Sequence, residues 1–505
     1  MIENTVIALD AGTDKAVDFL LKRYEKAKGT RENWVSLFEE CYEYALPQRE
    51  SFYAENPGQR RDDKIFDETA VVGVQEFASR LQSGLVPNFA RWADFIAGSE
   101  VPKEQRESVN AQLQEVTDYV FEVLQNSNFA QEVHESFLDL AVGTGVLLCE
   151  EGDAINPVRF SAIPLPHVVL DVGPDDRVDN IFRERQIRCG QILIAYPKAI
   201  LTPKIMERVK TYPEEKHKII EVIYRDYSKP NVMAHKYCVI DMQFKEKILE
   251  ERYEGIGSCP IIAYRWSKAS GEIYGRGPLI NALSAIKTTN LTIELILENA
   301  QMSISGIYQM EDDGVINADN ISLVPGTVIP KSPGSSGLQP INSAGRFDVA
   351  DLVLNDQRNN IKRALYNDML GNPDRIGSAF GRLQAELVTP VLQRVVYILK
   401  KQGRIDLPVI NGREVKVRSV SPLAQAQSQA DIVSVDRFLE LVGGRFGPQM
   451  VNLLIDSEEA SIYLARKFGV PDNLIRDKTS REQIIQMTAQ MAQQQQQQGM
   501  MEPQE

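Results

Sequence analysis

The sequence has 505 residues, a length that corresponds to about three domains at roughly 150 residues each. It carries 56 Lys and Arg against 70 Asp and Glu, a formal net charge of −14. This acidic balance argues against a protein that coats nucleic acid by gripping its phosphates. Hydrophobic residues at 43% and charged residues at 25% are typical of a folded globular chain.

No apolar run approaches the roughly 20 residues that cross a bilayer, so no membrane insertion is expected. The acidic start, Met1-Ile2-Glu3-Asn4, lacks the features of a secretory signal, which predicts a protein that stays in the cytoplasm where it is made. Widely spaced cysteines without a C-x-x-C pair are typical of reduced, mostly buried thiols. They are Cys41, Cys149, Cys189, Cys238 and Cys259.

Apolar residues at three- and four-residue spacing predict a mainly helical start to the chain. The predicted helical ranges are 14–44, 67–85 and 102–140. After Gly143-Thr144-Gly145, short β-branched and aromatic runs predict a mixed region with strands from about 145 to 265. The strand candidates are 146–149, 163–172, 219–227, 239–244 and 261–266.

A long helix is predicted over 279–303, directly after Tyr274-Gly275-Arg276-Gly277-Pro278. The next forty residues are rich in Gly, Pro, Ser, Asn and Asp, which indicates a small insertion with strand candidates at 315–316 and 327–329. A second helix is predicted over 347–370. Two helices that bracket a small module predict an αα-hairpin with a decorated tip.

The rest of the chain is predicted to be helical apart from one hairpin. That hairpin spans 405–420 around Asn411-Gly412, a type I′ turn signal. The predicted helices are 378–402, 423–442, 449–455, 457–468 and 481–498. The Gln-rich tail, 487–505, is of low complexity and is expected to be only partly ordered.

Catalytic and cofactor signatures are missing from the sequence. It contains no Gly-Lys pair and therefore no phosphate loop, and the Gly143-x-Gly145 and Gly275-x-Gly277 strings are interpreted as turns. The histidines show no zinc-binding spacing. Carboxylate groups at Asp171 with Asp175-Asp176, and at Glu311-Asp312-Asp313, suit solvated turns better than metal sites. We therefore predict no catalytic residue, cofactor or metal.

Several strings occur in a characteristic order along nearly the whole chain. They are Arg31-x-x-Trp34 with Tyr44-x-x-Pro47; Lys64-Ile65-Phe66-Asp67-x-Thr69-Ala70; Ala78-Ser79-Arg80-Leu81 through Leu85-x-Pro87 and Trp92; Tyr274-Gly275-Arg276-Gly277-Pro278; and Ser421-Pro422-Leu423-Ala424-Gln425-Ala426-Gln427. Together they resemble the portal, or head-to-tail connector, proteins of short-tailed bacteriophages. The resemblance implies structural roles for Trp34, Asp67, Thr69, Trp92, Tyr274, Gly275, Arg276, Gly277, Pro278 and Pro422.

The resemblance implies an α+β, mainly helical subunit of a portal-type ring. The implied wing is 1–278, with a helical part followed by a mixed α/β part. The implied stem helices are 279–303 and 347–370, with a clip between them at 304–346. A channel loop and the return to the wing follow at 371–420, and a crown with the Gln-rich tail at 421–505. Members of the family usually have a longer segment between the second stem helix and the next wing helix. In this sequence the short stretch from Leu370 to Gly377 makes that connection. This departure reflects either a short loop or omitted residues.

The implied function is a structural channel at one capsid vertex for DNA packaging and ejection. The implied partners are about twelve copies of the chain in a ring, weakly held double-stranded DNA, terminase, capsid and scaffold proteins, and tail adaptor proteins. The protein would be assembled in the host cytoplasm and carried in the virion. Two alternatives are an adaptor or scaffold ring without DNA passage, and a metal-dependent hydrolase that uses Asp171 or Asp175.

Two sets of charged residues are candidates for contact with these partners. Lys287, Lys362 and Arg363 lie on the predicted stem helices, where they could face passing DNA or instead form salt bridges or a solvated face. In the predicted clip, Glu311, Asp312, Asp313 and Lys331 could dock the packaging motor or tail adaptor. They equally suit an exposed turn.

Overall fold

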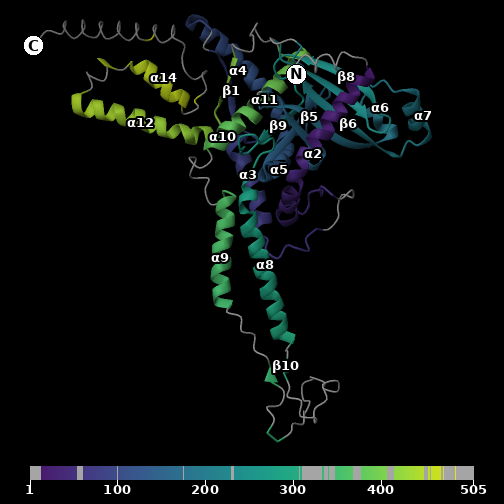
Figure 1. The fold of residues 1–505 in the computed structure, drawn as a ribbon. Coiled ribbons are helices and arrows are strands. Elements are labelled where there is room, and N and C mark those ends of the chain that lie inside the picture. Colours follow the sequence, from purple (N-terminus) through teal and green to yellow (C-terminus); the bar gives the residue numbers. More distant parts are fainter. Residues whose placement is uncertain are drawn as a thin grey trace, which may run out of the picture. The chain divides into compact units, whose positions relative to one another are not determined.

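Helices and antiparallel strands make up the computed structural model, which is a mainly helical α+β chain (Figure 1). It describes residues 13–53, 61–98, 101–174, 176–228, 232–305, 308–309, 333–334, 339–340, 347–367, 377–405, 415–447, 453–454, 456–467, 470 and 484. Within these residues the chain divides into two units. Unit 1 joins parts of 1–35, 77–277 and 369–505, and unit 2 joins 36–76 with 278–368.

The N-terminal region is helical, as the sequence predicts. The helices are α2 (Thr13–Ala45), α3 (Thr69–Leu85), α4 (Lys103–Asn126) and α5 (Phe129–Val142). The helix predicted over 102–140 is interrupted after Asn126. The Asn128 side chain there exchanges hydrogen bonds of 2.8 and 2.9 Å with the backbone of Phe160, which fixes the junction between the two helices against that residue.

The mixed region of unit 1 forms two antiparallel sheets. The larger has the order β4-β5-β6-β7-β8, with β4 (Val168–Val172), β5 (Val178–Arg188), β6 (Lys216–Arg225), β7 (Ala234–Asp241) and β8 (Glu246–Glu254). The smaller has the order β3-β2-β9, with β3 (Val158–Ala162), β2 (Thr144–Glu151) and β9 (Ile261–Arg265). The sequence located β2, β4, β6 and β9, and the candidate 239–244 overlaps only the end of β7. It did not identify β3, β5 or β8.

The five-stranded sheet is covered on both faces because its apolar residues alternate along the strands. Tyr24 and neighbouring residues of α2 pack on the face that carries Ile220. Ile192 and Ile205, from the short helices α6 (Ile192–Ala195) and α7 (Pro203–Thr211), pack on the face that carries Ile219. One sheet therefore organises two clusters of the unit 1 core.

Two long helices pack against each other in unit 2 (Figure 1). They are α8 (Pro278–Ser305) and α9 (Phe347–Ala364), and the short strands β10 (Tyr308–Gln309) and β11 (Gln339–Pro340) pair in the segment between them. The predicted αα-hairpin is therefore present. The strand candidates at 315–316 and 327–329 lie outside the described residues.

The second helix of this hairpin ends earlier than predicted, at Ala364 instead of residue 370. Tyr366 adopts a left-handed conformation, with φ of +59°. The N–H of Asn367 donates to the carbonyl of Lys362 at 2.9 Å, and the N–H of Tyr366 to that of Arg363 at 3.3 Å. This is the Schellman pattern, formed without the glycine that usually signals it, so no residue type in the sequence marked the helix end.

The predicted helix over 378–402 contains a π-helical turn. It consists of α10 (Gly377–Leu383), the turn Gln384–Val388 and α11 (Thr389–Lys401). Pro390 explains the turn, because proline has no N–H to donate to the carbonyl of Glu386 and its ring would clash with that carbonyl in an α-helix. The Thr389 N–H instead bonds to the Gln384 carbonyl, five residues back.

The last part of the described chain returns to the N-terminal region. β12 (Val415–Ser419) pairs with β1 (Ala93–Ala97), more than 300 residues away in the sequence. The other arm and the turn of the hairpin predicted over 405–420 lie almost entirely outside the described residues. Next come α12 (Pro422–Phe446) and α14 (Ser457–Lys467). Most of 449–455 and of 481–498, and the Gln-rich tail, also lie outside.

Two predictions about the whole chain can be compared with the described residues. No helix among them is both long and apolar enough to cross a membrane. All five cysteines are free, and only Cys259 is not fully buried, as the spacing of the cysteines predicted.

Candidate functional site: a polar clamp on the α8–α9 hairpin

Asp67 lies just before α3 in unit 2 and is buried. Its Oδ1 accepts a hydrogen bond of 2.9 Å from the Thr69 backbone N–H, which supports the start of α3. Its Oδ2 accepts from Arg358 of α9, at 2.8 Å from Nε and 2.7 Å from Nη2. The first turn of α3 is therefore joined to α9 by a charge-assisted contact.

The same turn is joined to α8 through Asn290. The side-chain Oδ1 of Asn290 accepts from the backbone N–H groups of Phe66 at 2.7 Å and Asp67 at 2.9 Å. Its Nδ2 donates back to the Ile286 carbonyl at 2.9 Å. Because residues 66–67 bind Asn290 by backbone and Arg358 by side chain, one short segment holds both long helices. We call Asp67, Asn290 and Arg358 the Asp67 clamp.

The surroundings of Asp67 favour its charged form. Burial alone would raise the pKa of the carboxyl, but hydrogen bonds from Thr69 and Arg358 and the guanidinium charge outweigh burial and lower it. Asp67 is therefore a carboxylate at neutral pH, and the clamp contains a complete ion pair.

A second link joins α2 to α8 at Lys287, one of the residues predicted to contact DNA. Lys287 Nζ lies 2.6 Å from Glu40 Oε2 and 5.9 Å from the centre of the Tyr44 ring. The other two predicted DNA contacts, Lys362 and Arg363, are exposed in the last turn of α9.

The end of α9 packs against α3 at Gly73. A Cβ atom at Gly73 would lie 2.7 Å from Leu365 Cδ1 and 3.0 Å from Asn367 Nδ2, closer than side chains approach without displacement. A glycine within α3 thus allows the capped end of α9 to approach its backbone.

In unit 1, the predicted motif around Tyr274 organises a loop. The Tyr274 hydroxyl accepts from the Leu170 N–H at 3.0 Å, and its ring lies 6.2 Å from that of Trp34. The guanidinium of Arg276 stacks 5.0 Å from the Trp34 ring and pairs with Glu272. Three residues of the predicted motif set therefore interact, with Trp34 in contact with both Tyr274 and Arg276.

The two Gly-x-Gly strings contact each other. The Gly277 N–H donates to the Val142 carbonyl, and the Gly275 N–H donates to Thr144 Oγ1, each at 2.8 Å. A Cβ at Gly275 would lie 2.1 Å from the Gly143 oxygen. These glycines permit a close backbone approach, although Gly143 caps α5 and Gly145 lies in β2, so the prediction that both strings form turns was incomplete.

The remaining predicted residues do not join the clamp. Trp92 is buried in unit 1 between Phe121 and Phe129. Pro422 occupies the first turn of α12, where the Ser421 side chain caps the helix by accepting from the Ala424 N–H. Pro278 begins α8. Glu311, Asp312, Asp313 and Lys331 lie outside the described residues.

Of the carboxylates considered for metal binding, only Asp171 and Asp176 lie among the described residues. Asp171 Oδ2 lies 2.7 Å from Arg23 Nε, and Asp175 lies outside the described residues. Within the described part of the chain, no three His, Cys, Asp or Glu residues are grouped closely enough to hold a metal ion.

Sequence reasoning missed Glu40, Asn290 and Arg358. They meet their partners across 223 to 291 residues of chain, and no local pattern distinguishes them from ordinary polar residues of amphipathic helices. Asn290 alone offered a weak signal, because it is a polar residue at a position that the periodicity of α8 would bury.

Comparison with known proteins decides the family. A family model described as bacteriophage head to tail connecting protein matches residues 18–475. The chain belongs to this family. It is a structural connector of bacteriophages and a protein of the virion, and the resemblance found in the sequence is confirmed.

Two curated portal proteins are similar along almost their whole length. A probable portal protein of Bordetella phage BPP-1 is 24% identical over 90% of this chain and 88% of its own. The portal protein of Salmonella phage epsilon15 is 22% identical over 94% of this chain and 91% of its own.

Solved structures resemble the chain only weakly. A chain from the virion of a native gene transfer agent particle and one from the neck of an empty particle of this kind each cover 80% of this chain and 90% of their own. Their identities are 11% and 13%, and both have a TM-score of 0.34.

Proposed function

We propose that about twelve copies of the chain form a closed ring at one capsid vertex, and that the ring is the channel for DNA packaging and ejection. In this proposal 1–278 and the return over 371–420 form the wing, and α8 and α9 form the stem. The range 304–346 forms the clip and 421–505 the crown. Family membership supports the connector role, and the features of α8 and α9 support the ring.

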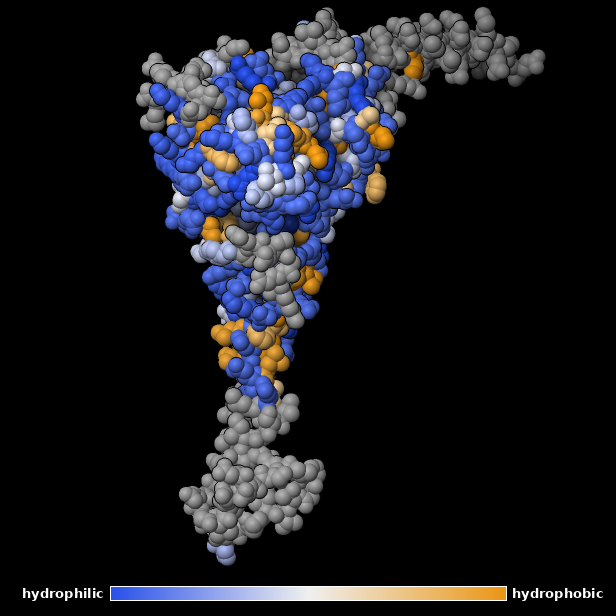
Figure 2. Space-filling model, turned by 90° about the vertical axis from the view of Figure 1, so that its right-hand side faces the viewer, coloured by the Kyte–Doolittle hydropathy of each residue, from blue (hydrophilic) through white to orange (hydrophobic). Residues whose placement is uncertain are grey.

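The observation that carries the ring proposal is the exposed apolar surface of α8 and α9. Leu291 and Leu295 of α8 are 56% and 55% exposed, and Leu352 of α9 is 73% exposed. Apolar side chains gather on this part of the surface (Figure 2). Leu291 and Leu295 are four residues apart and so share one helix face. A neighbouring copy in a ring would bury these leucines, as interfaces between subunits do.

The charge of the chain suits a channel that DNA passes without being held. The net charge of −14 opposes tight binding of phosphates, and the halves of α8 and α9 next to the proposed clip contain acidic residues and no basic ones. Contact with DNA is then limited to a few cations. Lys362 and Arg363 suit this role because they are exposed at the end of α9. Lys287 forms an ion pair with Glu40.

The two faces of such a ring would serve different partners. The clip, with Glu311, Asp312, Asp313 and Lys331, would dock terminase during packaging and tail adaptor proteins afterwards. Capsid and scaffold proteins would contact the wing during assembly in the host cytoplasm. The chain itself would act by geometry, as a hole of fixed width with two docking surfaces, and the motor that hydrolyses ATP would be a separate protein.

A charge placed among these exposed leucines of α8 and α9 tests the proposed contact between neighbouring copies. Leu295→Glu should shift the sedimentation profile of the purified protein from a large assembly to small species. The matched control Ile155→Glu changes a residue that is 85% exposed in a loop of unit 1 and should leave the assembly intact. Loss of assembly in both variants, or in neither, would contradict the proposed interface.

A further inference from the structure

We propose that the Asp67 clamp is a pivot that sets the angle between α8 and α9. In this role Asp67 and Arg358 are positioning residues for the end of α8 at Ser305 and the start of α9 at Phe347. The inference concerns one chain only and does not depend on ring formation.

Burial along α8 changes at the clamp. On the Pro278 side Leu279, Ala282, Leu283, Ile286, Thr289 and Asn290 are buried. From Leu291 to Gln301 none of the described side chains of α8 is buried. Along the part of α9 that comes before Arg358, Leu354 is the only buried residue between 350 and 357. The clamp therefore lies where the buried part of α8 ends, and beyond it Leu354 is the one buried side chain among the described residues of the two helices.

No opposite charges join the part of α8 that follows the clamp to the part of α9 that precedes it. From Thr288 to Ser305, α8 carries Glu294 and Glu298 and no Lys or Arg. From Phe347 to Gln357, α9 carries Asp348, Asp351 and Asp356 and again no basic residue. Like charges on neighbouring helices repel each other weakly, so no ion pair between these halves opposes an increase in the angle.

The length of α8 converts a small rotation into a large displacement. Fifteen residues separate Asn290 from Ser305, which at 1.5 Å per residue is a lever of about 22 Å. A rotation of about 10° at the clamp would move the end of α8 by about 4 Å. In Figure 1 the ribbons of α8 and α9 lie close together at one end and farther apart at the end that leads to β10.

The clamp binds α8 and α9 through different groups, so the two contacts can be changed separately. Asn290 holds α8 through backbone N–H groups, which no substitution at position 67 removes. Within the clamp, Arg358 of α9 contacts only the side-chain carboxylate of Asp67. Asp67→Asn keeps an oxygen for the Thr69 N–H but removes the negative charge that Arg358 needs. This variant should loosen α9 while α8 and the start of α3 stay in place.

The angle can be measured with spin labels at cysteines introduced by Glu298→Cys and Asp351→Cys. Cys259, the least buried native thiol, is first replaced by serine. Labelled protein is mixed with an excess of unlabelled protein, so that distances within one chain dominate the dipolar signal. The test variants are Asp67→Asn and Arg358→Gln, and Arg358→Lys is the conservative variant. Glu43→Gln is the control, because it breaks the exposed pair with Lys64 in the same unit.

The expected result is a narrow distance distribution in the unsubstituted background and in Glu43→Gln. Asp67→Asn and Arg358→Gln should each shift or broaden it by several ångströms, and Arg358→Lys should restore it in part. A lower unfolding temperature with an unchanged distribution would overturn the proposal, because the clamp would then stabilise the fold without setting the angle. If Asp67→Asn fails to fold, the two Arg358 variants decide the question.

Discussion

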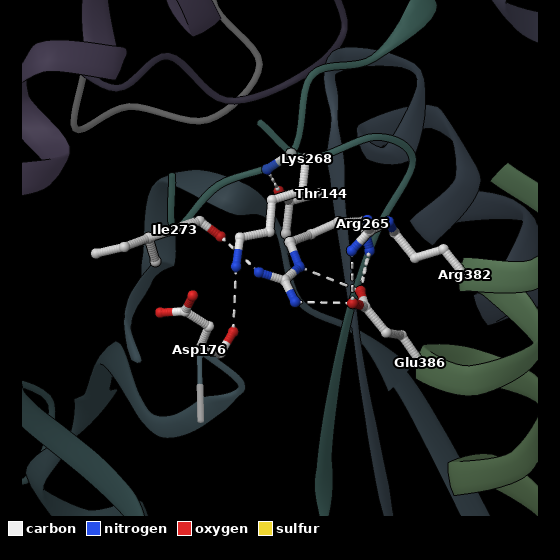
Figure 3. Close-up of polar contacts among 8 residues, drawn as sticks. Thr144, Asp176, Arg265, Lys268, Ile273, Arg382 and Glu386 are labelled. Atoms are coloured by element: carbon white, nitrogen blue, oxygen red, sulfur yellow. Dashed lines mark hydrogen bonds and ion pairs between the residues drawn. The ribbon is translucent and has the colours of Figure 1, made fainter. Parts of the chain in front are cut away.

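Glu386 and Arg265 form a two-point ion pair between the π-helical turn and the end of β9, across 121 residues of sequence (Figure 3). The Oε1 of Glu386 lies 2.7 Å from Arg265 Nη2, and Oε2 lies 3.1 Å from Nε. Oε2 also accepts the Arg265 backbone N–H, and Arg382 adds a contact of 3.2 Å. One carboxylate thus ties the π-helical turn and Arg382 of α10 to the end of β9.

Removal of that carboxylate charge should destabilise unit 1. Glu386→Gln leaves the buried guanidinium of Arg265 without a counterion, and we expect the free energy of unfolding to fall by about 3 kcal/mol in denaturant titrations. The control is Glu272→Gln, which breaks an exposed pair with Arg276 and should cost less than about 1 kcal/mol. Equal losses in the two variants would contradict this account of the pair.

Gly73 should not tolerate a larger residue. Gly73→Ala forces a methyl group against the buried Leu365 side chain, and we expect a loss of about 1 to 3 kcal/mol in the free energy of unfolding. Gly29→Ala is the matched control, since Gly29 lies within α2 and no neighbouring atom lies within 4 Å of the position that a Cβ would occupy. That change should stabilise the protein by up to about 1 kcal/mol. The idea fails if Gly73→Ala is neutral or stabilising.

Most long elements could be predicted from the sequence, because their apolar residues repeat with helical or strand periods. The deviations have local chemical causes that a periodicity does not record. Tyr366 ends α9 in a left-handed conformation that usually requires glycine. The π-helical turn had a readable signal in Pro390, which lies inside an otherwise regular helical pattern.

Only one residue of the clamp, Asp67, was accessible from the sequence. Asp67 and Thr69 were singled out through the family resemblance, but their partners Asn290 and Arg358 were not. A carboxylate selects its partner by three-dimensional proximity, and the pair Asp67–Arg358 spans 291 residues. The same holds for Lys287, whose contact with Glu40 spans 247 residues.

Acid should remove the contribution of Glu184 to stability. Burial raises its pKa, but hydrogen bonds from Tyr24 and Lys218 and nearby lysine charges outweigh burial and lower the pKa to about 2. In the unfolded chain the pKa of a Glu is about 4.3. At pH values above this, the lowered pKa of Glu184 stabilises the folded state by up to about 3 kcal/mol, and this stabilisation disappears as the pH falls towards 2.

The test compares the unfolding free energies of the unsubstituted protein and Glu184→Gln across pH. The difference should be largest at neutral pH and should shrink between about pH 5 and pH 2. Glu122→Gln, which removes an exposed carboxylate of α4, should show no such trend. A difference that does not depend on pH would show that Glu184 acts through packing and not through its charge.

Lys287 should behave as the partner of Glu40. We expect Lys287→Met and Glu40→Gln to lower the free energy of unfolding by similar small amounts, with a coupling of about 0.2 to 1 kcal/mol in a double-mutant cycle. Both should affect DNA packaging equally. If Lys287→Met alone impairs packaging and the coupling is zero, Lys287 contacts DNA and the pair with Glu40 is incidental.

Imaging of the purified protein by electron microscopy, together with a mass determination, tests the central claim most directly. The account predicts closed rings of about twelve subunits when particles are viewed down their axis. The central hole should be wider than the DNA duplex, which is about 20 Å across. A monomer or dimer at concentrations that support assembly would contradict the ring, and a closed ring with a narrower hole would favour an adaptor without DNA passage.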